Sequence, residues 1–256
     1  MRRSGELGRF ESPHGPTLAK LLTLVGLSGL LATANVASSS FDAGAVGATL
    51  RCDFDGDGFE DHALGVPRDD VDGFGDAGSV HVFYGTGAGL SASGDQVWAR
   101  GPGGLNHDSR SGDELGAALA CGDFDGDGYD DLAIGVPGDD LAGVSDAGSV
   151  QVVYGSSAGL TGVGNEVWHR ERAGINDEAA SGDRFGFAVA TGDFDGDDFD
   201  DLLVGVPGDV VGGHVDAGSA HVLYGSVDGV VSVDDQIWHL DRGGIFNVPQ
   251  PGDRFG

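Results

Sequence analysis

One stretch of the sequence recurs three times at a constant spacing of 70 residues, and this period limits the folds open to the chain. The stretch Asp-Phe-Asp-Gly-Asp begins at Asp53, Asp123 and Asp193. The segments downstream keep the same step, because Asp-Ala-Gly-Ser follows in each copy and tryptophan stands at positions 98, 168 and 238. Such a period is typical of repeat architectures, in which each repeat is one supersecondary unit that packs against its neighbours.

Each repeat contains four short apolar runs separated by Gly, Asp and Pro, and none shows the period of an amphipathic helix. Runs of this length between turn residues predict β-strands. In the second repeat we expect strands at Leu115–Cys121, Leu132–Val136, Ser149–Tyr154 and Asn165–Trp168 or Asn165–His169. A small four-stranded sheet cannot bury its faces alone. The sequence therefore predicts an all-β fold of β-propeller blades stacked face to face, with an internally duplicated β-sandwich as the alternative.

The period divides the chain into three whole blades and the start of a fourth. The last six residues, Pro-Gly-Asp-Arg-Phe-Gly, closely repeat the segment that opens the third blade. The predicted divisions are a signal peptide at 1–34, a linker at 35–43, blades at 44–110, 111–180 and 181–250, and the start of a truncated fourth blade at 251–256.

The first 34 residues have the pattern of an export signal. Basic residues at positions 2, 3, 9 and 20 precede the apolar run Leu21–Leu31, and small residues suited to cleavage after Ala34 follow. Spanning a bilayer takes about 20 apolar residues, so no transmembrane helix is expected in the mature chain. We expect the protein to be exported: secreted, periplasmic or at the cell surface.

The net charge and the motif content exclude several function classes. A formal charge of −29 repels phosphate backbones and anionic lipid, so no nucleic-acid partner is expected. The sequence contains no nucleophile elbow, P-loop, paired Cys or His-based metal motif. It therefore predicts a protein that is not an enzyme, unless a catalytic domain lies outside this chain.

The recurring acidic segment has the ligand pattern of a calcium loop. Aspartates occupy positions 1, 3, 5 and 9 of a nine-residue loop, and position 7 offers its backbone carbonyl. Hard oxygen donors without thiolate or imidazole suit Ca²⁺ better than Zn²⁺ or Cu²⁺, and Mg²⁺ prefers six tight ligands and keeps its waters. About three Ca²⁺ sites are predicted, with the ligands Asp53, Asp55, Asp57, Phe59 and Asp61; Asp123, Asp125, Asp127, Tyr129 and Asp131; and Asp193, Asp195, Asp197, Phe199 and Asp201.

Three alternatives to this metal site differ from it in pattern. An EF-hand needs a bidentate Glu at position 12, where this chain has Leu64, Ile134 or Val204, and nonapeptide β-rolls have a far shorter period. A solvated acidic turn would explain one copy, but three copies at one spacing favour a metal. In the third loop Asp198 replaces the glycine of position 6. Asp tolerates a left-handed backbone, so that site is expected to be weakened at most.

The remaining polar residues predict less. The acids after the second strand of each repeat, such as Asp69, Asp139 and Asp209, change spacing and are expected in a solvated loop. The repeated histidines at positions 81, 169, 221 and 239 are expected to be partly exposed strand residues. Cys52 and Cys121 lie one residue out of register in neighbouring repeats, so we expect two buried thiols rather than a disulfide.

These residues resemble the FG-GAP repeat of integrin alpha-subunit β-propellers and of glycosylphosphatidylinositol-specific phospholipase D. Phe-Gly stands at 185–186 and 255–256, with Leu-Gly at 115–116 as a variant, and Gly-Val-Pro replaces Gly-Ala-Pro at 65–67, 135–137 and 205–207. The family's calcium loop, Asp-x-Asp-x-Asp-Gly-x-x-Asp, lies between the two halves. The resemblance covers roughly residues 44–256, although Ala45-Val46 stands where the first Phe-Gly would be.

The resemblance implies a calcium-stabilised extracellular scaffold for adhesion or ligand recognition, in a propeller that closes with seven blades. Three blades then imply a partial propeller, completed by further C-terminal blades or by self-assembly of several chains, or an open arc. We expect structural calcium on one face and an unidentified protein or glycan partner on the opposite face, where segments 138–148 and 171–184 lie. The alternatives are a non-catalytic accessory propeller of a secreted hydrolase and a purely structural surface array.

Overall fold

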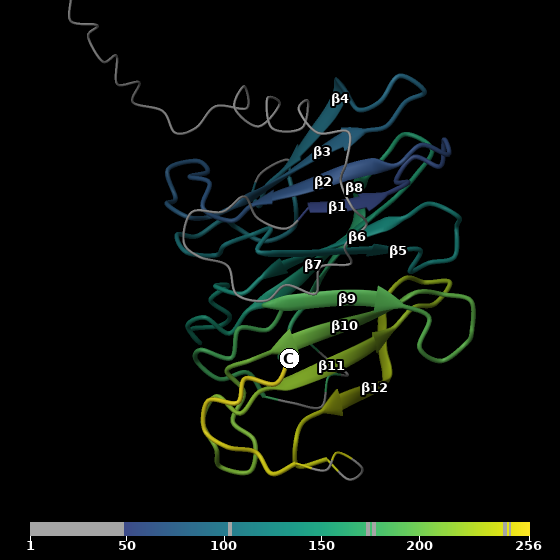
Figure 1. Ribbon diagram of the computed structural model, residues 1–256. Helices are drawn as coiled ribbons and strands as arrows, with labels where there is room; N and C mark the ends of the chain where they lie inside the picture. The colour runs from purple at the N-terminus through teal and green to yellow at the C-terminus, as the bar shows by residue number, and fades with distance from the viewer. Residues whose placement is uncertain (1–48, 102–103, 173–174, 176–177, 243–244, 246) are drawn as a thin grey trace, which may run out of the picture. The chain divides into compact units, whose positions relative to one another are not determined.

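The computed structural model describes residues 49–101, 104–172, 175, 178–242, 245 and 247–256. The predicted signal peptide and linker lie outside this range. Within it, twelve β-strands form three four-stranded antiparallel sheets, no helix occurs, and so no helix could cross a membrane (Figure 1). The strands of each sheet follow one another in chain order, which confirms the prediction of three four-stranded propeller blades.

Corresponding strands occupy corresponding positions in the three repeats. Blade 1 contains β1 (Thr49–Cys52), β2 (Asp61–Val66), β3 (Ser79–Tyr84) and β4 (Ser91–Trp98). Blade 2 contains β5 (Ala118–Gly122), β6 (Asp131–Val136), β7 (Ser149–Tyr154) and β8 (Thr161–Trp168). Blade 3 contains β9 (Ala188–Gly192), β10 (Asp201–Val206), β11 (Ser219–Tyr224) and β12 (Val231–Trp238). Strand β7 has the predicted bounds, whereas β8 starts four residues before the prediction because its first half is polar and Gly-containing.

Strand β5 starts three residues later than predicted, because Leu115 and Gly116 belong to the junction with blade 1. The Leu115 N–H donates to the carbonyl of Ala77 at 3.0 Å. Gly116 has a φ of +87°, and a Cβ there would lie 3.0 Å from the Cα of Gly65 and 2.9 Å from the carbonyl oxygen of Ser79. The Leu-Gly and Gly-Val-Pro segments thus meet backbone to backbone, which only glycine permits.

Two hydrophobic cores lie between the blades and join them face to face. The first combines Phe54, Val80 and Val82 of blade 1 with Leu132, Ile134, Val153 and Leu160 of blade 2. The second combines Phe124, Val150 and Val152 of blade 2 with Leu202, Val204, Leu223 and Val230 of blade 3. Phe54 and Phe124, which hold the same repeat position, are both fully buried. Each blade therefore buries its apolar faces against its neighbours, as propeller blades do.

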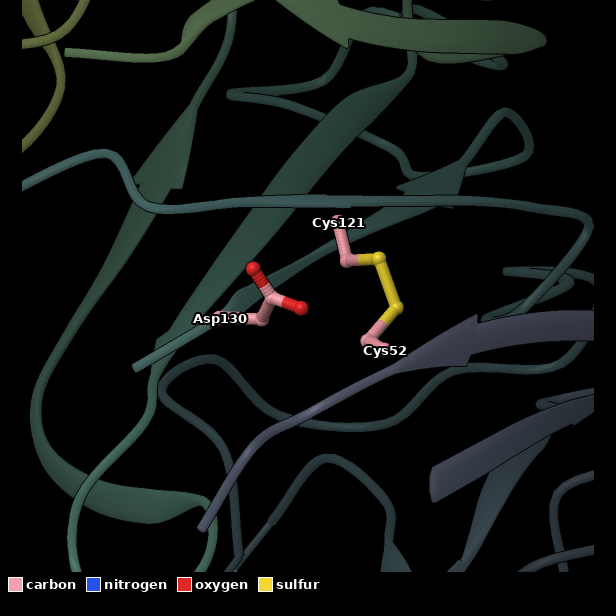
Figure 2. A group of neighbouring side chains, drawn as sticks. All are labelled: Cys52, Cys121 and Asp130. Atoms are coloured by element: carbon pink, nitrogen blue, oxygen red, sulfur yellow. A yellow bond between two sulfur atoms is a disulfide. The ribbon is translucent and has the colours of Figure 1, made fainter. Parts of the chain in front are cut away.

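A disulfide joins the first strands of blades 1 and 2. Cys52 of β1 and Cys121 of β5 are bonded to each other, with their Cα atoms 6.4 Å apart (Figure 2). The prediction of two separate thiols is wrong, because repeat position does not decide which residues of adjacent strands meet. At the next junction the equivalent residues are Gly122 and Thr191, and the Thr191 hydroxyl donates to the carbonyl of Cys121 at 2.5 Å. Asp130 lies beside the disulfide, but bonded sulfurs supply no thiolate, so this group is not a metal site.

Candidate metal sites at the blade junctions

The structure brings three predicted ligands together in each acidic loop. The loop between the first and second strands of a blade holds aspartates at positions 1, 3 and 5, and one carboxylate oxygen from each lies within 4.8 Å of the other two. This spacing suits shared coordination of one cation. The three trios are Asp53, Asp55 and Asp57; Asp123, Asp125 and Asp127; and Asp193, Asp195 and Asp197.

The first aspartate of each loop organises the backbone around this point. In the first loop, the N–H groups of Asp57 and Gly58 donate to the Asp53 carboxylate at 3.1 and 3.0 Å, and Phe59 N–H donates to Asp57 at 2.8 Å. Position 6 closes the turn in the left-handed region, with φ of +86° at Gly58, +90° at Gly128 and +74° at Asp198. The expectation that Asp198 accepts the glycine conformation is therefore confirmed.

The aspartate at position 9 anchors the base of the loop. Asp61 is fully buried and accepts from the N–H groups of Phe54 at 2.8 Å and Gly85 at 2.7 Å, one on each carboxylate oxygen. Asp131 makes the same two contacts with Phe124 and Gly155. Each carboxylate oxygen keeps a further lone pair. Ligation by the position-9 aspartates and by the position-7 carbonyls of Phe59, Tyr129 and Phe199 remains a prediction.

The electrostatics of these loops favour a bound cation. Burial raises the pKa of Asp131 to about 8, with the charges of Asp125 and Asp123 adding to the effect, and burial raises the pKa of Asp61 to about 6. These shifts arise because the carboxylates are withdrawn from water next to other acids. A divalent cation in the trio would supply the missing positive charge, so the donor set and its electrostatics both fit Ca²⁺.

Each acidic loop is also bonded to the loop of the preceding blade. The Asp130 carboxylate accepts from the Asp53 N–H at 2.8 Å, and the Asp130 N–H donates to the Asp53 carbonyl at 3.1 Å. Asp200 repeats both contacts with Asp123, each at 3.0 Å. Sequence analysis missed this role, although an acid at position 8 of all three loops was the available signal.

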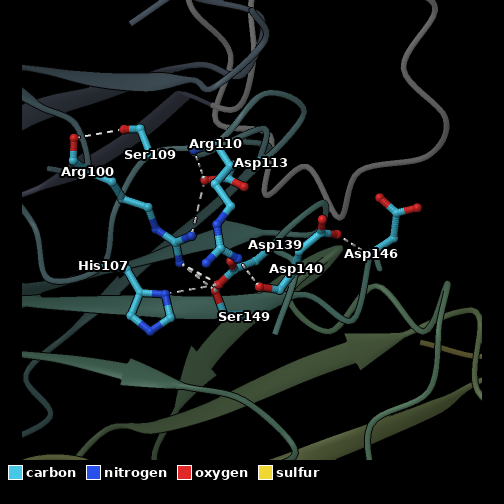
Figure 3. A network of polar contacts seen from close by, with 9 residues as sticks. All are labelled: Arg100, His107, Ser109, Arg110, Asp113, Asp139, Asp140, Asp146 and Ser149. Carbon is cyan, nitrogen blue, oxygen red and sulfur yellow. Dashed lines mark hydrogen bonds and ion pairs between the residues drawn. The ribbon is translucent and has the colours of Figure 1, made fainter. Parts of the chain in front are cut away.

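A buried arginine fastens the opposite end of the first junction. Arg100, just after β4, reaches into blade 2, where its Nη2 lies 2.9 Å from the Asp139 carboxylate and 2.7 Å from Ser149 Oγ (Figure 3). Its Nη1 lies 3.4 Å from Asp113, and all three charged side chains are 1% exposed. Burial opposes ionisation of Asp139, but the hydrogen bond and charge of Arg100 outweigh it and lower its pKa. We call this arrangement the arginine latch.

The latch recurs once and is then replaced. Arg170 pairs with Asp183 at 2.5 Å and Asp209 at 3.0 Å, whereas Leu240 stands at the equivalent position of the third repeat. The expectation of a solvated loop is wrong for Asp139 and Asp209, because each accepts an arginine from the preceding blade. Two arginines 70 residues apart, each two residues after a repeated tryptophan, were the signal in the sequence.

The repeated histidines agree with expectation at three of four positions. Those at 81, 169 and 239 are half-buried, whereas His221 is fully buried and packs edge-on against Phe185, with ring centroids 5.5 Å apart. The expectation of partial exposure is therefore wrong for His221.

Two open hollows lie at the surface of the described residues. One, of about 490 Å³, is formed by the connection from β4 to β5 and includes Asn106, His107, Asp108 and Arg110. The other, of about 460 Å³, lies beside the first acidic loop, next to Asp55, Asp57 and Tyr84. In a meander these two connections emerge at opposite ends of the strands, so the first hollow lies on the side away from the acidic loops.

The fold and the repeated loops define a β-propeller protein with an acidic loop in every blade. The sequence matches the family model of the FG-GAP repeat at residues 42–83, 115–153 and 185–223, and the chain belongs to the FG-GAP repeat proteins. The first half of the repeat signature supplies the glycine at each junction, and the second supplies the glycine that it meets.

Curated relatives share this repeat. The chain is 35% identical over 123 residues to phosphatidylinositol-glycan-specific phospholipase D of Rattus norvegicus, which covers 48% of this chain and 14% of the relative. It is 34% identical over 191 residues to integrin alpha-PS2 of Drosophila melanogaster, which covers 72% of this chain and 12% of the relative. Among solved structures, a Bacillus licheniformis rhamnogalacturonan lyase matches 78% of this chain and 35% of its own at 14% identity, with a TM-score of 0.44 that is too low to support an argument.

Proposed function

We propose that this chain is an exported, non-catalytic β-propeller scaffold that binds Ca²⁺ in its three acidic loops and recognises a protein or glycan on the opposite face. The observation that carries the proposal is the same trio of aspartates in three loops, each organised by the same backbone hydrogen bonds. The Cys52–Cys121 disulfide supports an oxidising, extracytoplasmic compartment.

The proposed role of calcium is structural. The N–H and carbonyl of Asp53 hold Asp130 of the next blade while its carboxylate belongs to the first trio. A cation in that trio would fix Asp53 and, through it, the junction between two blades. Calcium would therefore act on stability first and on ligand recognition only through the shape of the propeller.

The hollow beside Asn106 and His107 supports recognition on the opposite face. It combines an amide, an imidazole, a carboxylate and a guanidinium from one short connection, which suits a polar ligand such as a glycan or a polar protein surface. The hollow beside the acidic loop is lined by the predicted calcium ligands Asp55 and Asp57, so we assign it to the metal.

Calcium is expected to raise the melting midpoint of this chain. Extracellular oxygen-ligand sites bind at about 10⁻⁴–10⁻³ M, so 1 mM Ca²⁺ should add about 0.4–1.4 kcal/mol per site. Thermal melts with Ca²⁺, with Mg²⁺ and with chelator check this. A cooperative melt that ignores calcium would overturn the proposal and return the loops to solvated turns.

Neutralising one trio should remove one site. The double substitution Asp123→Asn with Asp125→Asn is expected to leave two calcium ions bound per chain and to reduce the calcium-dependent rise in midpoint by about a third. The matched control, Asp95→Asn with Asp108→Asn, removes the same charge from exposed positions outside the loops and should bind three ions. Isothermal titration of calcium into each variant gives the counts, and equal counts in the two variants would contradict the site assignment.

The second candidate function is an accessory propeller of a secreted hydrolase. The similarity to phosphatidylinositol-glycan-specific phospholipase D favours it. Sequencing the coding region beyond residue 256 separates the candidates. A His/Asp-rich metal-hydrolase domain would support the accessory role, and further FG-GAP repeats followed by a surface anchor would support adhesion.

A further inference from the structure

We propose that two copies of this chain bind head to tail, with the outer face of blade 1 of one copy packed against the outer face of blade 3 of the other. We define the head face by Phe59, Gly89 and Leu90, and the tail face by Phe194, Gly196 and Tyr224. Each face presents one half of contacts that the two junctions inside the chain already make. The proposal goes beyond calcium binding and ligand recognition and does not depend on either.

The first shared contact places an aromatic ring over a glycine. A Cβ on Gly56 would lie 2.7 Å from the Tyr129 ring of the next blade, and a Cβ on Gly126 would lie 2.5 Å from the Phe199 ring. At the tail face, Gly196 holds the same position with nothing within 4 Å of its Cβ direction. At the head face, Phe59 holds the position of the two rings and is 44% exposed.

The second shared contact joins a tyrosine hydroxyl to a hairpin of the next blade. The Leu160 N–H donates to Tyr84 Oη at 2.8 Å, and the Val230 N–H donates to Tyr154 Oη at 3.2 Å. Leu160 and Val230 are 3% and 2% exposed. Leu90 holds their position on the head face and is 40% exposed, and Tyr224 holds the position of the two tyrosines on the tail face.

The third shared contact covers a phenylalanine at position 2 of the acidic loop. The Ser156 N–H donates to the Phe54 carbonyl at 3.2 Å, and the Ser226 N–H donates to the Phe124 carbonyl at 3.0 Å, while both rings are fully buried. At the tail face Phe194 is 51% exposed. On the head side, residue 86 holds the position of the two serines and is a threonine.

These equivalences point to a second copy as the occupant. Both faces are built from repeat positions that already fit each other twice in this chain, so the head face of another copy matches the tail face contact by contact. The exposure of Leu90 and Phe194 shows that the two faces do not meet within one chain. Propellers close with about 4–8 blades, so two three-bladed copies can form a six-bladed ring.

The strand-entry position at this junction is already filled. Residues 252–255 lie along blade 3, where the N–H groups of Gly252, Arg254 and Phe255 donate to carbonyls of residues 215–217 at 3.0 Å each. Residues 112–115 lie along blade 1 in the same way. The second copy therefore needs to contribute only its blade from β1 onward.

The junction between copies lacks the arginine latch. Leu240 stands where Arg100 and Arg170 stand, while the acceptors Asp253 and Asp69 occupy the positions of Asp113 and Asp139. Asp69 already accepts from Ser79 Oγ at 2.7 Å, as Asp139 does from Ser149 at 2.6 Å. The contact between copies should therefore be weaker than the two internal junctions, and an arginine at position 240 should strengthen it.

Sedimentation velocity of the full chain between 1 and 100 µM tests the proposal. The wild-type chain should form dimers. Leu90→Asp, which blocks the head face, and Phe194→Ser, which blocks the tail face, should each be monomeric alone, yet an equimolar mixture should form dimers through the intact tail of one and the intact head of the other. A monomeric wild type, single variants that associate like wild type, or a mixture that stays monomeric would each overturn the proposal.

A gain of affinity provides the second test. Leu240→Arg should lower the dissociation constant of the dimer at least tenfold, because the new guanidinium can reach Asp253 and Asp69 of the second copy. Adding Asp69→Asn should remove most of that gain. An unchanged dissociation constant for Leu240→Arg in a chain that still melts cooperatively would contradict the assigned contact.

Discussion

Replacing Arg100 with methionine is expected to lower the free energy of unfolding by about 3–5 kcal/mol, because it leaves Asp113 and Asp139 buried without a counter-charge. For a chain of this size the midpoint should fall by about 10 °C. Thermal and urea unfolding of the full chain measure both quantities. Arg170→Met should cost a similar amount at the second junction, since its two acceptors are equivalent.

Controls separate the latch from a general effect of losing an arginine. Arg110→Met removes an exposed arginine whose Nη1 donates only to the Asp140 carbonyl, and it should change stability by about 0.5 kcal/mol or less. Adding Asp139→Asn to Arg100→Met should restore part of the loss, because it removes one unpaired buried charge. A loss for Arg100→Met no larger than that for Arg110→Met would contradict the latch.

The same variant should show a pH dependence of known sign. Arg100 holds the pKa of Asp139 below its usual value, so its stabilisation is full above the unfolded pKa and is lost as pH falls through the folded pKa. In Arg100→Met the unpaired acids gain protons more readily, and the variant loses stability as pH rises above about 4. The stability gap between wild type and variant should therefore be wider at pH 7 than at pH 4.

Breaking the Cys52–Cys121 disulfide should have the next largest effect. The bond closes a loop with a sequence separation of 69 residues. The chain-entropy relation gives about 4 kcal/mol for a loop of this length, and measured losses run from about 2 to 5 kcal/mol. The double variant Cys52→Ala, Cys121→Ala should unfold at a correspondingly lower urea concentration.

Reduction of the wild-type chain gives an independent check. With a phosphine reductant present, the wild-type midpoint should fall to that of the double alanine variant, while the variant itself should not move. A reductant that shifts both proteins equally would show that the loss does not come from this bond.

The fold was predictable because its signals are local and repeat. Turn residues and short apolar runs bound the strands, and the constant step places equivalent strands in equivalent positions. The gathering of Asp53, Asp55 and Asp57 was also predictable, since their spacing lies within one loop. The left-handed backbone of Asp198 followed from the position it shares with two glycines.

The contacts between blades were not predictable from one repeat alone. The Cys52–Cys121 bond, the Arg100–Asp139 pair and the Asp130–Asp53 contact join residues of different blades, and each depends on which residues the stacking brings together. A loop acid such as Asp139 cannot be told from a solvated one until the arginine that covers it is placed. The period does carry the information, because residues 70 apart repeat the contact, but only the stacked structure pairs them.

The most direct test of this account counts the calcium ions that the chain holds. Equilibrium dialysis of the full chain against radioactive ⁴⁵Ca²⁺ at several millimolar, with excess Mg²⁺ present, should give about three ions bound per chain. Asp123→Asn with Asp125→Asn should give about two. No calcium retained by the folded wild-type chain under these conditions would contradict the account.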